Sequence, residues 1–271
     1  MLFRSVPGGP GALAPSAFAQ AFPVNPVRIV STLTAGSPAD GLIRLAAQRL
    51  SEQFGQPVVV DVQAGAGGIL GAQAVARSAA DGHTMLYTLS TTVVITPQLL
   101  KTRPYELKDL TPLMVTSRAA ISMVANIAFP PSNIRELVEY ARANPGKLAY
   151  GSNGIGGIYH LEMEMLKQAH QLDIAHIPYK GGTDSLLAAV AGTIPIAFSP
   201  AASAMSQVRA GKVKILAILD YQRVADFPDV PSMGEQFAGY EKMSSGVDMY
   251  GPAGLPSALV KRLYGELAKA F

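Results

Sequence analysis

Short apolar runs alternate with longer amphipathic segments along most of the chain. The short runs, rich in Val, Ile and Leu, are typical of buried strands, whereas the longer segments repeat apolar residues every three or four positions, as helices do. This alternation predicts an α/β fold with mostly parallel sheets, because each helix returns the chain to the edge where the next strand begins. The predicted strands are 27–32, 58–62, 84–88, 121–127, 148–150, 174–177, 194–198 and 213–219.

The best-marked helix follows the first strand. Ser37 is a suitable N-cap, Pro38 fits the first helical position, and Asp40 completes a capping box. Gly55 ends this helix, because glycine tolerates the left-handed conformation of a C-cap. Further helices are expected between the later strands, and a last one begins near Pro256.

Small residues gather where the predicted strands end. Turns rich in Gly, Ser and Thr occur at 36–37, 65–68, 90–92 and 152–157. Ligands of open α/β sheets bind beyond the carboxyl ends of the strands, and two such units that face each other enclose a cleft. We therefore expect a first lobe of residues 27–122 and 220–271, a second lobe of residues 123–219, and a ligand cleft between them.

The first 26 residues differ from the rest. Arg4 places a charge near the start, and Ala17-Phe18-Ala19 before Gln20 has the small-residue pattern of a signal-peptide cleavage site. We interpret residues 1–26 as a signal-peptide remnant, with a disordered tail as the alternative. The long uncharged run 185–208 is broken by one glycine and two prolines, so it does not predict a membrane-spanning helix.

Composition and motif spacing remove several classes of function. The chain has no cysteine, which excludes disulfides, thiol nucleophiles and thiolate metal sites. Its net charge is only +3 and its Lys and Arg residues are scattered, so it lacks the basic patch of a nucleic-acid-binding protein. Its four histidines lack metal-site spacing, and Leu70 and Tyr159 stand where two G-x-G-x-x-G motifs would need a third glycine. We predict no metal and no cofactor.

Two further alternatives concern function. A Ser152–His160 couple would suit a hydrolase, although Tyr150 stands where the motif G-x-S-x-G requires its first glycine. The effector domain of a transcription regulator would need a helix-turn-helix, which the Pro- and Gly-rich residues 1–26 cannot supply. The chain is predicted not to be an enzyme, with the hydrolase as the alternative.

The turns of small residues favour anion binding. The first N–H groups of a helix have no acceptor within the helix, and the helix dipole adds positive potential at that end. Small side chains let a ligand approach this backbone, so a carboxylate can be held without Arg or Lys. The sequence thus predicts a carboxylate cradle made mainly of backbone amides.

Several motifs occur in the order found in one known family. They are 36–40, 55–60, 65–68, 143–148, 176–182, 209–212, 228–231 and 251–256. Together they resemble the tripartite tricarboxylate transporter substrate-binding proteins, also called the Bug family of Bordetella uptake proteins, from about Val27 onward. The resemblance implies a two-lobed, type II-like periplasmic binding protein that is a monomer, lies in the periplasm, and serves a membrane permease. It also implies a small carboxylate as ligand: a dicarboxylate, a tricarboxylate, an acidic amino acid or an aromatic acid.

The resemblance also implies which residues contact the ligand. From the first lobe they are Ala35, Gly36, Ser37, Ala66, Gly67, Ser90 and Thr92. From the second lobe they are Ser152, Asn153, Gly157, Tyr179 and Ser199.

The chain departs from the family at two places. Gly157-Ile158-Tyr159 stands where the family has small hydroxyl residues, and Ser199-Pro200 replaces a frequent Asp-Asn. Both changes remove polar groups, so we expect a ligand that is less polar than a tricarboxylate. The family also continues past position 271, and we expect the last strand and helix of the first lobe to lie there.

Overall fold

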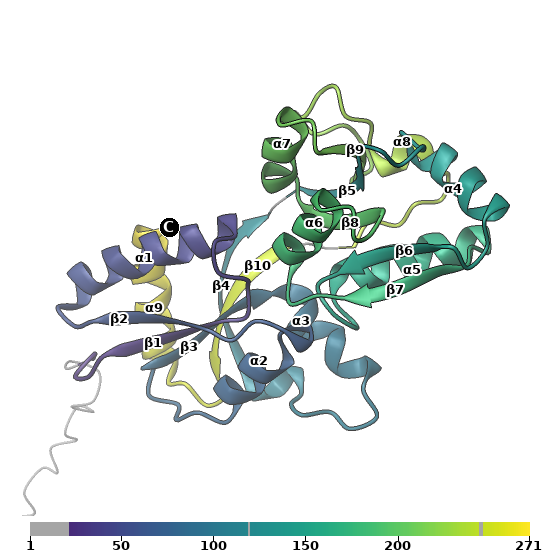
Figure 1. Cartoon of the computed structure of the whole chain (residues 1–271). Coiled ribbons are helices and arrows are strands. Elements are labelled where there is room, and N and C mark those ends of the chain that lie inside the picture. Colours follow the sequence, from purple (N-terminus) through teal and green to yellow (C-terminus); the bar gives the residue numbers. More distant parts are fainter. Residues whose placement is uncertain (1–21, 119, 244–245) are drawn as a thin grey trace, which may run out of the picture.

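The computed structural model describes residues 22–118, 120–243 and 246–271. Within these ranges the strands form two five-stranded sheets, each flanked by helices, in two lobes (Figure 1). No helix in the described part of the chain is long and apolar enough to cross a membrane. The expected cleavage motif Ala17-Phe18-Ala19 lies outside the described residues.

The first lobe is built from both ends of the described chain. Its elements are β1 (Val27–Ser31), α1 (Pro38–Phe54), β2 (Val58–Val62), η2 (Ala66–Gly68), α2 (Ile69–Ala76), β3 (Thr84–Leu89), α3 (Ser90–Val94), η3 (Thr96–Leu99), η4 (Leu107–Asp109), β4 (Leu110–Arg118), β10 (Gly246–Pro252) and α9 (Ser257–Ala270). The strand order is β2-β1-β3-β10-β4. Only β10 of these strands runs against the others, since β1 pairs in parallel with β2 and β3 while β10 is antiparallel to β3 and β4.

The second lobe repeats this topology. Its elements are β5 (Ile121–Asn126), α4 (Ile134–Ala143), β6 (Leu148–Ser152), α5 (Ile158–His170), β7 (Ile174–Pro178), α6 (Gly182–Val190), β8 (Ile196–Pro200), α7 (Ala201–Arg209), β9 (Val213–Ile218) and α8 (Met233–Gln236). The strand order is β7-β6-β8-β5-β9, and β5 is the antiparallel strand. Both lobes therefore have a mostly parallel sheet, as predicted.

The cores follow the predicted apolar faces. Along α1, Ile43 and Leu50 are fully buried and pack with Ile29 of β1 and with Leu263 of α9. Helix α9 lies beside α1 on the same face of the first sheet (Figure 1). Each such side chain, when fully buried, contributes about 1.5–3 kcal/mol to stability. The apolar residues whose spacing predicted the helices are therefore the ones that pack them against the sheet.

Two strands depart from the sequence prediction. The segment 246–252, Gly-Val-Asp-Met-Tyr-Gly-Pro, contains turn-forming residues, yet it is β10, buried along its whole length. No strand was predicted between residues 88 and 121, but β4 runs from Leu110 to Arg118. Both strands depend on each other, because β10 pairs with β4 along nearly its entire length.

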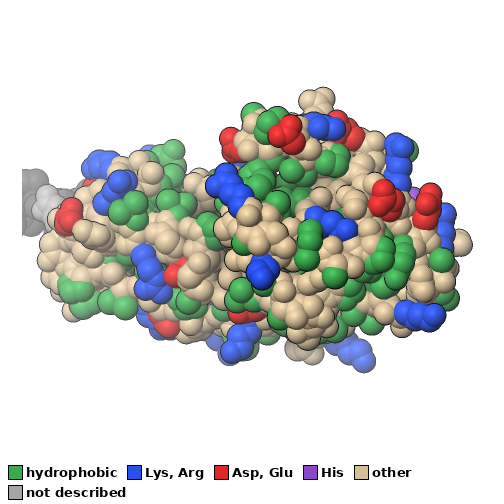
Figure 2. Space-filling model, turned by 45° about the horizontal axis from the view of Figure 1, so that its top comes forward, with side chains coloured by type: hydrophobic (Ala, Val, Ile, Leu, Met, Phe, Trp, Pro, Cys, Tyr) green, Lys and Arg blue, Asp and Glu red, His purple; other side chains and the backbone are tan. Residues whose placement is uncertain are grey.

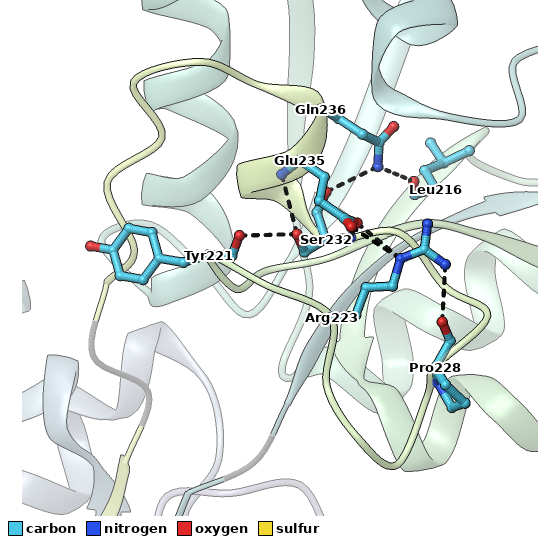
Figure 3. Close-up of polar contacts among 7 residues, drawn as sticks. All are labelled: Leu216, Tyr221, Arg223, Pro228, Ser232, Glu235 and Gln236. Carbon is cyan, nitrogen blue, oxygen red and sulfur yellow. Dashed lines mark hydrogen bonds and ion pairs between the residues drawn. The ribbon is translucent and has the colours of Figure 1, made fainter.

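The segment after β9 is fastened to the second lobe. Figure 3 shows Arg223 paired with Glu235 at 3.1 Å and the side chain of Gln236 donating to the carbonyl of Leu216 in β9. Ser232 and Glu235 form a capping box at the start of α8. The expected domain division stays a prediction, and these contacts lead us to propose a second lobe that extends to residue 243 rather than to 219. Met233 and Tyr240 accordingly lie in its core.

Candidate ligand-binding site

A cavity of about 260 Å³ lies between the two lobes. Its walls come from the turn between β1 and α1, the glycine turn at η2, the start of α5, and the start of α6. The ends of β4, β5 and β10, where the chain passes between lobes, also contribute. The cavity therefore lies where the predicted cleft was expected.

Four of the expected contact residues line this cavity: Ser37, Gly67, Thr92 and Asn153. Asn153 also supports the site, because its Oδ1 accepts a hydrogen bond of 3.3 Å from the amide of Tyr159. Thr92 is buried and donates to the carbonyl of Gly67 at 3.0 Å. These two side chains thus line the cavity and also fix the backbone of its walls through hydrogen bonds.

At the start of α1, the backbone amides of Gly36 and Ser37 already have hydrogen-bond acceptors within the protein. The amide of Gly36 donates to Asp40 Oδ2 at 2.9 Å, and the amide of Ser37 donates to the carbonyl of Thr34 at 3.2 Å. The capping box predicted at Ser37 is therefore half right: Ser37 Oγ accepts from the Asp40 amide, but the Asp40 carboxylate accepts from Gly36 instead of Ser37. Ala35 and Gly36 are exposed and do not line the cavity.

Ser152 and Ser199 are fully buried and do not line the cavity. Ser152 Oγ lies 2.6 Å from Nε2 of His176, so it is paired with that histidine rather than with the expected His160. Burial lowers the pKa of His176 to about 4, with a smaller contribution from neighbouring His160. A nucleophile must reach a bound substrate, and a serine closed inside the second lobe does not. The hydrolase alternative thus gains nothing from this pair.

The remaining expected residues have other surroundings. Ser90 Oγ donates to the carbonyl of Gly246, at the point where the chain re-enters the first lobe, with a distance of 3.2 Å. Gly157 is the N-cap of α5, and a Cβ at this position would overlap the Asn153 side chain. Ala66 and Tyr179 line a second, more open hollow next to the cavity.

Residues that were not predicted supply most of the polar groups in the cavity. Gly181 is the N-cap of α6, and Gly181, Gly182 and Thr183 all line the cavity. No side chain among the described residues caps this helix end. The hydroxyl of Thr183 is buried without a hydrogen-bond partner in the described part of the chain. The Gly181-Gly182 pair, which belongs to the motif 176–182, was the available sequence signal.

Tyr159 adds a second hydroxyl to this end of the cavity. Its ring stacks on Phe198 with centroids 5.9 Å apart, and a Cβ at Gly182 would lie 3.0 Å from its hydroxyl oxygen. Burial raises the pKa of Tyr159, so the phenol stays protonated at neutral pH and can donate a hydrogen bond. The phenol, the Thr183 hydroxyl and the start of α6 form one group of donors.

Lys180 is the only Lys or Arg on the cavity wall, as far as the structure describes the chain. Its side chain is exposed, and it directly precedes Gly181. Elsewhere, Lys and Arg side chains are spread over both lobes on the face shown in Figure 2. Positive charge is thus not concentrated around the site.

The lobes touch each other around the cavity. Thr96 Oγ1 of the first lobe donates to the carbonyl of Gly156 in the second lobe at 3.0 Å. A Cβ at Gly154 would lie 2.9 Å from the amide nitrogen of Gly67, and a Cβ at Gly181 would overlap Thr34 Oγ1. The two lobes therefore approach each other through glycines at the margin of the cavity.

Comparisons with known proteins agree with the two-lobed fold. The family model described as the tripartite tricarboxylate transporter family receptor matches residues 42–271. A UPF0065 protein of Bordetella pertussis is 36% identical over 250 residues, covering 92% of this chain and 77% of that protein.

Three solved structures are similar over most of their length. The periplasmic binding protein BugD has a TM-score of 0.83 at 31% identity, over 92% of this chain and 83% of the other. A protein of R. palustris with adipate has a TM-score of 0.84 at 29% identity, over 91% and 83% of the two chains. MatC of Rhodopseudomonas palustris with bound malate has a TM-score of 0.85 at 27% identity, over 92% and 85%.

Proposed function

Because the chain belongs to the family of tripartite tricarboxylate transporter receptors, which are solute-binding proteins and not enzymes, we propose that it captures a small carboxylate between its lobes for a membrane transporter. The observation that carries this proposal is the uncapped start of α6, with the partnerless hydroxyl of Thr183, on the wall of the cavity as the described residues form it. Unpaired donors of this kind call for an acceptor that the protein does not provide.

The start of α6 suits an anion for elementary reasons. The first N–H groups of a helix lack intrahelical acceptors, and the dipole favours negative charge by about 0.3–1 kcal/mol. Gly181 and Gly182 have no side chain to keep a ligand from this backbone. Hydrogen bonds to a charged group contribute about 1.5–3 kcal/mol each. Two backbone amides with the hydroxyls of Thr183 and Tyr159 would therefore hold one carboxylate with about micromolar affinity, which needs about 8 kcal/mol.

Relatives support the carboxylate. The two R. palustris structures are named for adipate and malate, and both molecules are carboxylates. The two-lobed architecture supports delivery to a transporter, because a ligand that touches both lobes favours the closed form, which a permease can distinguish from the open form. We further propose that the protein works in the periplasm, which the similarity to the periplasmic protein BugD supports. Residues of both lobes of one chain line the cavity, which supports action as a monomer.

Replacing Thr183 with Val tests the donor group. The change keeps the shape of the side chain and removes its hydroxyl, so we expect carboxylate affinity to fall by about ten- to a hundredfold, the loss of one charge-assisted hydrogen bond. Isothermal titration against a panel of small carboxylates measures it. Thr193→Val, at an exposed position just after the same helix, is the matched control and should bind as the wild type does. An unchanged affinity in Thr183→Val would place the carboxylate elsewhere.

A substitution of Lys180 tests whether the ligand carboxylate is held mainly by the backbone amides at the start of α6 or by the Lys180 ammonium group. Since its side chain is exposed, a pairing with the ligand would contribute only about 0.2–1 kcal/mol. We expect Lys180→Gln to weaken binding less than about fivefold, and this small loss to vanish in high salt. A much larger loss, comparable to that in Thr183→Val, would show that the cation is the principal anchor.

A further inference from the structure

We propose that His160 and His176 are positioning residues for ligand capture: a pair of neutral imidazoles that holds the turn 153–157 in the shape that binding requires, so that protonation of the pair weakens binding. The two residues come from α5 and β7, which lie beside each other in the second lobe (Figure 1). Neither of them lines the cavity. The inference rests on the proposed function, because Asn153 of this turn lines the cavity.

The turn between β6 and α5 has little stiffness of its own. Gly154 and Gly156 have φ values of 105° and 76°, a backbone region that glycine adopts readily and other residues rarely do. Glycine also leaves many other conformations open to the turn. Yet the turn must carry Asn153 to the cavity wall, and the carbonyl of Gly156 must meet Thr96 of the first lobe. Side chains outside the turn therefore have to fix its shape.

His160 fastens the end of the turn next to α5. Its Nδ1, in the first turn of that helix, accepts a hydrogen bond of 3.3 Å from the amide of Gly156. Gly156 is thus held at its N–H by His160 and at its carbonyl by Thr96. An accepting nitrogen carries no proton, so this contact requires neutral His160 with its proton on Nε2. Protonation of His160 turns Nδ1 into a donor and breaks the contact.

His176 fastens the end of the turn next to β6. Its Nε2 lies 2.6 Å from Ser152 Oγ, and the same hydroxyl accepts a hydrogen bond of 3.0 Å from the amide of Gly154. The His176 ring stacks on Tyr150 with centroids 5.0 Å apart, and its centroid lies 4.3 Å from that of His160. Two imidazolium rings this close would repel each other. The arrangement therefore suits two neutral rings.

The surroundings keep both rings neutral near neutral pH. Burial is the main cause that lowers the pKa of His160 and that of His176, the latter to about 4. Glu164 of α5 opposes this shift, but it is paired with Lys167 at 2.7 Å and accepts from the Tyr150 hydroxyl at 2.8 Å. Lys167 itself lowers both pKa values further. Since both lie below the ordinary value of about 6.5, the contribution of the pair is complete above that pH and is lost as the pH falls through the lowered values.

Two substitutions of His160 test the accepting nitrogen. The probe is whichever of adipate, malate, citrate, glutamate and benzoate the wild type binds most tightly in isothermal titration at about pH 7.5. His160→Leu removes the acceptor and should weaken binding of this acid by about three- to tenfold, the loss of one hydrogen bond. His160→Asn offers its Oδ1 to the Gly156 amide in place of Nδ1, and it should bind within about twofold of the wild type.

The pH profile separates positioning from packing. Asparagine does not titrate, so we expect the dissociation constant of the wild type to rise relative to that of His160→Asn by at least about threefold between about pH 7.5 and about pH 5. The ionisation of the acid itself cancels in this ratio. His170→Asn is the matched control, because it removes another histidine of α5 with a lowered pKa, whose ring packs against Phe237. It should follow the wild type at both pH values.

A double-mutant cycle tests the route from His160 to the first lobe. If His160 acts through Gly156 on the contact with Thr96, the combination of His160→Leu with Thr96→Val should weaken binding much less than the product of the two single losses. Losses that multiply would show two independent effects and would overturn the proposed route.

The outcomes separate this inference from the proposed function. A constant ratio between the wild type and His160→Asn, or equal losses in His160→Asn and His160→Leu, would overturn the positioning role and leave carboxylate capture standing. So would wild-type binding by His160→Leu, and the comparison with His160→Asn holds even if the leucine variant does not fold. Absence of binding of all five acids by the wild type would overturn the proposed function and this inference with it.

Discussion

Gly181→Ala is expected to weaken ligand binding by about ten- to a hundredfold while the protein remains folded. The backbone of Gly181 is extended (φ −169°), so alanine adopts it without strain. Its methyl group, however, would overlap Thr34 Oγ1 on the facing lobe. Overpacking of this kind costs about 1–3 kcal/mol, and the cost falls on the closed form alone because the two residues belong to different lobes.

Titration calorimetry measures the loss of affinity, and small-angle scattering shows whether ligand still makes the protein more compact. Thr34→Gly combined with Gly181→Ala should recover most of the affinity, since it removes the side chain that the new methyl group would overlap. Gly265→Ala is the matched control, because that glycine of α9 has open space around it. Wild-type affinity in Gly181→Ala would mean that binding does not require the lobes to meet at Thr34.

Glu162→Gln is expected to remove a pH dependence of stability of roughly 3 kcal/mol. Glu162 is 2% exposed, and its pKa is raised to about 7 by burial, against the opposing influence of the Met243 amide, the Tyr240 hydroxyl and Lys242. Because the folded-state pKa lies above the unfolded one, the contribution is complete below about pH 4.5 and is lost as the pH rises through about 7.

The quantity to measure is the difference in unfolding free energy between the wild type and Glu162→Gln, from denaturant titrations between about pH 4.5 and about pH 8. His160 and His176 have lowered pKa values, so their contributions change in the opposite direction and would obscure the wild-type curve taken alone. Glu52→Gln, at an exposed position, is the control, and its difference from the wild type should stay constant over this range. If the difference for Glu162→Gln stayed equally constant, Glu162 would be ionised in the folded protein throughout.

The fold was largely predictable because its signals are local. Ser37, Pro38 and Gly55 mark the ends of α1 in the sequence as they do in the structure. By contrast, β10 contains glycine, aspartate and proline, and it becomes a strand only because β3 and β4 flank it. Pairing of segments more than a hundred residues apart leaves no periodic trace in either one.

The site was predictable only in part, for a related reason. The strand-end turns indicated where a ligand would lie, and Asn153 and Gly67 do line the cavity. The sequence did not show which donors are free to bind a ligand. In the structure, the Gly36 amide donates to Asp40, and Ser152 is hydrogen-bonded to His176. Leu42 and Tyr159 line the cavity through the relative position of the two lobes, which spacing within one helix does not encode.

The strands that join the lobes also form part of the cavity wall. Ser117 and Ile121 flank one crossing, and Val247 follows the other. A ligand bound as proposed would contact the strands that join the lobes, so a bulky group would hold the lobes apart and a slender one would let them close further. The width of the bound acid should thus set the angle between the lobes. A transporter that recognises this angle would distinguish ligands by their width without contacting them directly.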